Sequence, residues 1–112
     1  MKKVFIVAAR RTAIGKFMGS LASINPGELG AIVIKELINE TGIDPKVVDT
    51  VIAGNILSAG QMQGVARQAS IKAGIPVEVP AYSINMVCGS GMKAVMNGYS
   101  GILSGLAEVV IA

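Results

Sequence analysis

The residues best suited to chemistry in this 112-residue chain surround its only cysteine, Cys88. An apolar, strand-like run leads into the segment Asn85-Met86-Val87-Cys88-Gly89-Ser90-Gly91-Met92-Lys93-Ala94, and an amphipathic helical pattern follows it. This order predicts a thiol at a helix N-terminus, where the helix dipole stabilises an anion by about 0.3–1 kcal/mol. Gly89 and Gly91 add no side-chain bulk, which leaves space beside the sulfur for a bulky substrate. The segment therefore indicates a nucleophile open to a substrate carbonyl.

The same segment has two other interpretations. A thiol usually needs a nearby base such as histidine to become a strong nucleophile, and the chain has no histidine. A single cysteine is more often an inert, buried apolar residue. Gly89, Gly91 and Ala94 also match the spacing of a dinucleotide-binding loop, but its acidic partner belongs at the end of the next strand, and Glu108 precedes that strand. The spacing alone leaves a nucleophile and a structural cysteine open, and it disfavours nucleotide binding.

Other candidate residues carry weaker signals. Lys93 is placed to raise the thiolate character of Cys88, although a solvated position is the simpler expectation. Arg67 and Gln68 fit either a site or a contact that ties helices together, and we favour the structural role. We expect four methionines to pack against apolar surface, namely Met62, Met86, Met92 and Met96. The sequence assigns no metal site and no specific substrate-binding residue.

Four apolar runs predict the strands that position Cys88. The run from Val4 to Ala9 is nearly continuous, as expected of a strand buried on both faces. Residues 49–55, 80–85 and 109–112 predict three more strands, with Pro80 at an edge where proline is tolerated.

Three helical patterns separate these strands. Asn25, Pro26 and Glu28 are typical of a capped helix start, and Gly42 marks its end. Residues 63–73 predict a second helix. Residues 89–106 predict a third that packs one face on a core, formed by Met92, Val95, Met96, Tyr99, Ile102, Leu103 and Leu106. The order β-α-β-α-β-α-β predicts an α/β fold with a mostly parallel sheet.

The composition indicates a chain that lacks part of its own polar surface. Charged residues make up 15% of the chain, where about 25% is usual in a soluble domain. The mean hydropathy is +0.61. We therefore expect the chain to associate through apolar surface or to be part of a larger protein. Its end inside an apolar, strand-like run predicts a truncation.

Several classes of protein are excluded. No apolar run reaches the roughly 18 residues that suggest a membrane span, and the run after Lys3 is too short for a secretory signal. The net charge is +3, but there is no Trp and only two Tyr and two Phe, so the aromatic platforms of nucleic-acid-binding proteins are missing. One cysteine forms no intrachain disulfide, which favours a reducing compartment, and we expect the cytoplasm.

From Asn85 to Ala94 the sequence resembles the nucleophile segment of the thiolases. Residues 11–17 with 19–21 resemble the N-terminal signature of that family, and residues 54–60 with 66–69 resemble the stretch between. The resemblance covers essentially the whole chain, in order, and is greatest to the bacterial acetyl-CoA acetyltransferase branch. Residues 1–112 are thus expected to form the first part of a thiolase N-terminal domain.

The resemblance implies an acyltransferase with a layered αβαβα fold of two similar halves. Cys88 would take an acyl group from an acyl-CoA, with its backbone N–H in an oxyanion hole at the helix N-terminus. A second acyl-CoA, deprotonated at its α-carbon, would attack this thioester to form a 3-ketoacyl-CoA, with thiolysis as the reverse. For acetyl-CoA the product is acetoacetyl-CoA, in fatty acid metabolism. Coenzyme A thioesters would be the substrates, without a cofactor or metal, and the intact enzyme would be a homodimer or homotetramer.

The resemblance also marks what these residues lack. It places the activating histidine, a second cysteine and most coenzyme A contacts in the C-terminal half of the family, whereas this chain has no histidine and one cysteine. An alternative is therefore an inactive truncated or structural fragment that needs a C-terminal half. A degradative 3-ketoacyl-CoA thiolase is another alternative. Ketoacyl synthases and hydroxymethylglutaryl-CoA synthases have different nucleophile segments.

Overall fold

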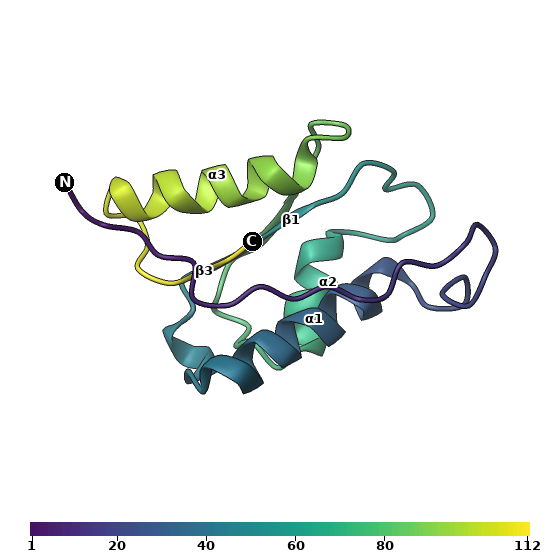
Figure 1. Ribbon diagram of the computed structural model, residues 1–112, viewed down its shortest axis with the longest axis horizontal. Helices are drawn as coiled ribbons and strands as arrows, with labels where there is room; N and C mark the ends of the chain where they lie inside the picture. The colour runs from purple at the N-terminus through teal and green to yellow at the C-terminus, as the bar shows by residue number, and fades with distance from the viewer.

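A three-stranded parallel sheet lies at the centre of the molecule, whose computed structural model describes residues 1–112 (Figure 1). The central strand, β1 (Thr50–Gly54), pairs in parallel with β2 (Ala81–Ile84) on one side and with β3 (Val110–Ile111) on the other. These strands lie within three of the four predicted runs. The predicted α/β fold with a parallel sheet is thus confirmed.

Helices lie on both faces of this sheet (Figure 1). One face carries α3 (Ser90–Leu103), and the other carries α1 (Pro26–Thr41) and α2 (Val65–Lys72). A short 3-10 helix, Pro45–Val47, follows α1. The order of the three helices along the chain agrees with the sequence patterns. The connection from β1 to β2 runs through α2 and the connection from β2 to β3 runs through α3, as parallel pairing requires.

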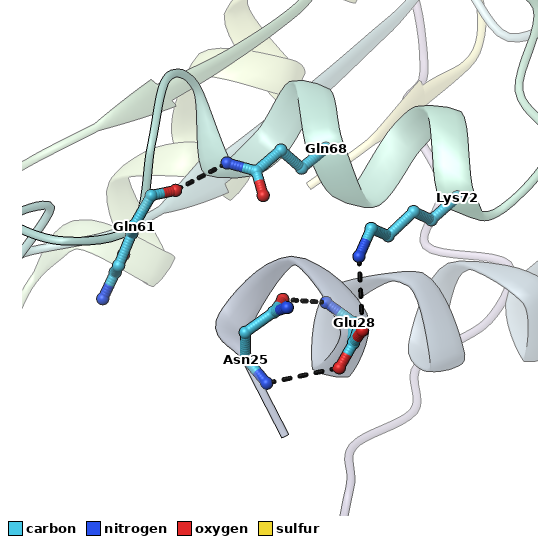
Figure 2. A network of polar contacts seen from close by, with 5 residues as sticks. All are labelled: Asn25, Glu28, Gln61, Gln68 and Lys72. Atoms are coloured by element: carbon cyan, nitrogen blue, oxygen red, sulfur yellow. Dashed lines mark hydrogen bonds and ion pairs between the residues drawn. The ribbon is translucent and has the colours of Figure 1, made fainter. Parts of the chain in front are cut away.

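The start of α1 is a capping box, as the sequence predicted (Figure 2). Asn25 Oδ1 accepts a hydrogen bond from the Glu28 N–H at 2.9 Å, and Glu28 Oε2 accepts one from the Asn25 N–H at 3.4 Å. Gly42 ends the helix with a φ of 67°, a conformation that favours glycine. The Glu28 carboxylate also lies 3.3 Å from the Lys72 ammonium of α2, so one acidic side chain both caps α1 and joins it to α2.

Small residues let α1 and α2 cross closely. A Cβ atom at Gly30 would lie 2.8 Å from the Cβ of Ala69, which is too near for two carbon atoms. Beneath this crossing lies the main core cluster, which consists of Ile34, Val48, Val51, Ala69, Ile75 and Val79. This face of the sheet is therefore closed by large aliphatic side chains.

The orientation of α3 differs from the sequence prediction. Its buried residues are the small ones, Ser90, Ala94 and Gly98, spaced four apart along one side of the helix. Large residues predicted to face a core are instead between 39% and 85% exposed, namely Met92, Val95, Met96, Tyr99 and Leu106. Periodicity identifies residues that share a face, but it does not say which face touches the sheet. The small side chains let α3 approach the strands, and a Cβ at Gly98 would lie 3.0 Å from Val110 Cγ1.

The predicted strand from Val4 to Ala9 is not formed. The segment is extended and crosses the molecule without joining the sheet (Figure 1), and its N–H and C=O groups make no backbone–backbone hydrogen bond. Phe5, Ile6 and Val7 are 73–80% exposed. A strand forms only when a neighbouring strand accepts and donates its ladder hydrogen bonds, so an apolar, β-rich sequence does not make one alone.

An apolar groove of about 590 Å³ lies between this N-terminal segment and the rest of the molecule. Its walls come from residues 4–10, from α1, from α3 and from residues 109–112, and 18 of its 21 lining residues are hydrophobic. Cys88 is not among them. None of the helices has the combined length and apolar character needed to cross a bilayer.

Candidate active site around Cys88

Cys88 lies in the short turn that connects β2 to α3. The strand ends at Ile84, the helix begins at Ser90, and Gly89 is the helix cap. The thiol is free and exposed. The structure thus places Cys88 immediately before the N-terminus of α3, the position that the sequence predicted, and shows that it is not a buried apolar residue.

The turn holds an unusual backbone conformation at Val87. Its φ is 48°, in the left-handed region that β-branched residues rarely adopt. Val87 N–H donates a hydrogen bond to Asn85 Oδ1 at 2.9 Å. Val87 C=O accepts hydrogen bonds from the Ser90 N–H at 3.1 Å and from the Ser90 hydroxyl at 2.6 Å. The residue before the cysteine is thus fixed at both of its peptide groups.

These contacts leave the backbone N–H of Cys88 free. It donates to no acceptor within the protein, although the N–H groups of Gly89 and Ser90 on its C-terminal side are both paired. An unpaired N–H beside an exposed thiol, at the start of a helix, can donate to an oxygen that carries developing negative charge. No group of three or more His, Cys, Asp or Glu side chains that could hold a metal ion is present in the chain.

The end of β1 sets the position of the start of α3. A Cβ atom at Gly54 would lie 2.5 Å from the Gly91 nitrogen and 2.6 Å from the Ser90 carbonyl carbon. Only a residue without a side chain fits there, because the obstructing atoms are backbone atoms of the helix. Gly54 therefore allows the sheet to touch the helix that follows Cys88, a contact that the sequence analysis did not identify.

The two glycines after Cys88 have different surroundings. A Cβ at Gly91 would meet nothing within 4 Å, which agrees with open space beside the turn. A Cβ at Gly89 would lie 2.6 Å from Met86 Cε, so glycine at this position makes room for the methionine side chain.

Hydrogen bonds also connect the turn to the loop after β1. Asn85 Nδ2 donates to the Ile56 carbonyl at 3.4 Å, and the Asn55 N–H donates to the Ile84 carbonyl at 2.9 Å. Asn55 Nδ2 in turn donates to Gln61 Oε1 at 3.1 Å. The loop of residues 55–64 is therefore held beside the Cys88 turn.

Arg67 and Gln68 have structural roles, as favoured from the sequence. Arg67 donates from its guanidinium to the carbonyls of Val77 and Val79, the latter at 2.7 Å, which fixes the segment between α2 and β2. Gln68 Nε2 donates to the Gln61 carbonyl at 2.7 Å (Figure 2) and thereby holds the 55–64 loop.

Among the remaining candidates, Met86 belongs to the turn, and the Lys93 N–H donates to the Gly89 carbonyl at 2.8 Å. Lys93 is half-buried and forms no ion pair. The expectation that four methionines pack apolar surface is wrong within this chain, because Met62, Met86, Met92 and Met96 are all at least 50% exposed. Ser90 is the residue that the sequence analysis missed. Its signal was a serine between two glycines at the first turn of a helix, a position where side-chain hydroxyls bond to the backbone.

Comparisons with known proteins agree on one family. The family model described as "Thiolase, N-terminal domain" matches residues 4–112. An acetyl-CoA acetyltransferase of Pseudomonas aeruginosa is 56% identical over 112 residues, which are 100% of this chain and 28% of that protein. A probable acetyl-CoA acyltransferase of Staphylococcus aureus is 45% identical over the same shares of the two chains. The chain thus spans 28% of the length of these curated relatives.

A solved structure gives the same result in three dimensions. The crystal structure of the Acat5 thiolase from Ascaris suum in complex with coenzyme A superposes with a TM-score of 0.87 and 39% sequence identity. The match covers 89% of this chain and 26% of that one. The fold of this chain is therefore similar to the corresponding part of a thiolase.

Proposed function

Because this chain belongs to the thiolase family, we propose that Cys88 is the nucleophile through which the protein transfers an acyl group from a coenzyme A thioester. The observation that carries this proposal is the geometry of the turn, in which an exposed thiol stands next to an unpaired backbone N–H at the start of α3. Residues 1–112 then form the first part of the N-terminal domain of the enzyme.

The chemistry follows from these two groups. The Cys88 thiolate attacks the thioester carbonyl of an acyl-CoA, and the carbonyl oxygen gains negative charge. The backbone N–H of Cys88 donates to that oxygen and stabilises the tetrahedral intermediate. The intermediate collapses to acyl-Cys88 and releases coenzyme A as a thiol once it takes up a proton. Splitting the transfer into two steps in this way is the usual benefit of a covalent nucleophile.

The second step forms the new carbon–carbon bond. A second acetyl-CoA loses a proton from its α-carbon, and the resulting carbanion attacks the acyl carbon on Cys88. Acetoacetyl-CoA leaves, and the Cys88 thiolate is restored. Reversal of the same steps is thiolysis. The family resemblance implies that a histidine and a second cysteine handle this proton, and these 112 residues contain neither a histidine nor a second cysteine.

Other properties of the protein belong to the same proposal. Coenzyme A thioesters are substrates, and no further cofactor is needed. The exposed apolar side of α3 and the exposed segment Phe5–Val7 support assembly into a homodimer or homotetramer. The single free cysteine supports a reducing, cytoplasmic setting, where the activity serves fatty acid metabolism.

A second candidate rests on the missing base. As an isolated chain, residues 1–112 contain no histidine and no second cysteine to accept the proton in the condensation, which favours a non-catalytic fragment that needs a C-terminal half. A relative named probable acetyl-CoA acyltransferase is 45% identical to this chain. A degradative 3-ketoacyl-CoA thiolase is therefore an alternative to the acetyl-CoA acetyltransferase.

The first test is acetylation of the protein expressed from its complete gene. Incubation with acetyl-CoA should add one acetyl group at Cys88, located by mass spectrometry of the peptides. Cys88→Ser should abolish the label and lower kcat/KM for acetoacetyl-CoA thiolysis by about 10³-fold or more. Its unfolding midpoint should match that of the wild type, because Cys88 is exposed.

Two outcomes contradict these proposals. An unlabelled Cys88 in a fully active enzyme would exclude its role as acyl acceptor. Thiolysis by the 112-residue chain alone, at a rate that Cys88→Ser abolishes, would exclude the non-catalytic fragment.

A further inference from the structure

One hydroxyl group links the two sides of the Cys88 turn. Ser90 is only 4% exposed. Its Oγ accepts a hydrogen bond from the Met86 N–H at 2.8 Å and donates one to the Val87 carbonyl at 2.6 Å. A single buried side chain thus joins the first residue of α3 to the two residues that precede Cys88.

The conformation held by this hydroxyl is unfavourable by itself. At a φ of 48°, the Val87 side chain is crowded by its own backbone, and a β-branched residue persists there only when its surroundings enforce it. Without the Ser90 hydroxyl, Val87 would keep the Asn85 Oδ1 contact to its N–H and the Ser90 N–H contact to its C=O. Both partners lie within three residues of Val87 in sequence, so neither ties it to a distant part of the protein. A relaxation of Val87 toward negative φ would rotate the following peptide, which carries the Cys88 N–H.

We propose that Ser90 is a positioning residue for acyl transfer at Cys88. Its hydroxyl holds Val87 in the left-handed conformation and thereby keeps the Cys88 N–H directed at the oxygen of the acyl group that the thiol attacks. The inference rests on the proposed function, since it concerns the same turn and the same reaction. Ser90 does not touch the reacting atoms and acts only through the backbone.

The reaction is sensitive to this placement for a geometric reason. A donor stabilises an oxyanion only when it lies about 2.7–3.1 Å from the position that the oxygen will occupy. A displacement of about 1 Å can cost about 100-fold in rate. Reactions of the thiol that develop no oxyanion, such as alkylation, do not depend on the Cys88 N–H. Loss of the Ser90 hydroxyl should therefore separate acylation from alkylation.

The chain contains a matched control. Ser70, in α2, is fully buried at 0% exposure, but its hydroxyl has no hydrogen-bond partner in the protein. Ser70→Ala therefore removes a buried serine hydroxyl without breaking a hydrogen bond. A second control is Ser104→Ala at the opposite end of α3, where an exposed hydroxyl donates to the Gly101 carbonyl at 3.1 Å.

The experiment compares Ser90→Ala, Ser70→Ala, Ser104→Ala and the wild type, each expressed from the complete gene. We expect Ser90→Ala to lower kcat for thiolysis by about 10- to 100-fold, with KM changed less than threefold. The rate of Cys88 alkylation by iodoacetamide should stay within threefold of the wild-type rate. Both control variants should resemble the wild type in all three measurements.

A second variant tests the role of Val87 directly. Val87→Gly removes the side chain that is crowded at positive φ. The loss of kcat caused by Ser90→Ala should therefore be at least threefold smaller in the Val87→Gly background than in the wild-type background. Equal losses in the two backgrounds would overturn the coupling through Val87.

The remaining outcomes are equally decisive. A kcat for Ser90→Ala within threefold of that for Ser70→Ala would overturn the inference. A rate of Cys88 alkylation that falls by the same factor as kcat in Ser90→Ala would overturn it as well. If Ser90→Ala does not fold, Ser90→Cys replaces the hydroxyl by a thiol, which is a weak donor and a weak acceptor, and a wild-type kcat for that variant would overturn the inference. If wild-type Cys88 is acetylated, only the role of Ser90 is at stake. If it is not, the proposed function fails and the inference fails with it.

Discussion

The two faces of the sheet are packed by different kinds of residues. Under α1 and α2, large aliphatic side chains such as Ile34 and Val51 close the core. Under α3, the contacts come from small residues such as Ala94 and Gly98, while Met96 and other large residues of that helix stay exposed. One face therefore buries most of the apolar surface, and the other brings backbone close to backbone.

This difference assigns separate tasks to the two faces. Full burial of a large aliphatic side chain contributes about 1.5–3 kcal/mol, so the face with Ile34 and Val51 supplies most of the stability. Alanine and glycine bury little area, but they fix the distance between a helix and a strand. The α3 face therefore fixes where the helix begins, and Cys88 lies immediately before that helix start. Substitutions on the two faces should therefore have different effects.

The largest effect on stability is expected from the aliphatic face. Ile34→Ala should lower the free energy of unfolding by about 2–5 kcal/mol, because it leaves a cavity in a packed cluster. In the unassembled chain, Met96→Ala, on the exposed side of α3, should change it by no more than about 0.5 kcal/mol. Urea denaturation followed by circular dichroism measures both. A cost for Met96→Ala as large as that for Ile34→Ala would show that the outer side of α3 is covered in solution.

A smaller loss of stability, with a larger effect on function, is expected where β1 meets α3. Gly54→Ala places a methyl group 2.5 Å from the Gly91 nitrogen, which should cost about 1–3 kcal/mol and shift the helix start. Acetylation of Cys88 should slow accordingly. The control is Gly101→Ala in the same helix, where a Cβ meets nothing within 4 Å and the substitution should stabilise the helix by about 0.5–1 kcal/mol. Equal acetylation rates in the two variants would disprove the positioning role of Gly54.

The smallest effect is expected at the edge of the sheet. Asp49 Oδ2 accepts hydrogen bonds from the Glu108 N–H at 2.6 Å and from the Val109 N–H at 3.0 Å, just before β3. The backbone N–H groups of Glu108 and Val109 hold the pKa of this carboxyl below its ordinary value of 3.8. A carboxyl with a lowered pKa in the folded state stabilises the fold above its unfolded pKa, and this contribution disappears as the pH falls through the folded value.

Asp49→Asn tests this contact with little change in shape. The variant should be slightly less stable than the wild type at pH 7, and the difference should shrink as the pH is lowered from about 5 toward 2. Urea denaturation at several pH values measures it. A difference that stays constant with pH would show that the Asp49 charge does not contribute to holding β3.

Local signals in the sequence predicted local structure well. The capping box of Asn25 and Glu28 and the αL glycine Gly42 define α1 within the chain itself, and the structure confirms all three. The apolar runs at β1 and β2 were also confirmed, because their partners lie within these residues. The strand predicted for Val4–Ala9 is absent, because a strand needs a neighbouring strand to pair with and a pattern of residue types does not reveal one.

The turn that holds Cys88 was predictable in outline only. The type and spacing of residues around Cys88 placed a thiol before a helix, and the structure has that arrangement. The conformation of Val87, the contacts of Ser90 and the approach of Gly54 depend on φ angles and on distances between segments far apart in sequence. In α3, the small residues Ser90, Ala94 and Gly98 mark the side that packs on the sheet. The larger apolar residues have a stronger periodic pattern, and that pattern predicted the wrong side.

The contact at Gly54 limits how this site can be redesigned. At this position β1 meets the backbone of Ser90 and Gly91 with a glycine, so there is no β1 side chain at the contact that a shorter one could replace. In the proposed reaction, widening the space beside Cys88 for a longer acyl group therefore requires changes elsewhere, beginning with the loop of residues 55–64, where most side chains are exposed and hydrogen bonds hold Asn55 and Gln61. Selection for new substrates in the laboratory should recover substitutions in that loop while position 54 stays glycine.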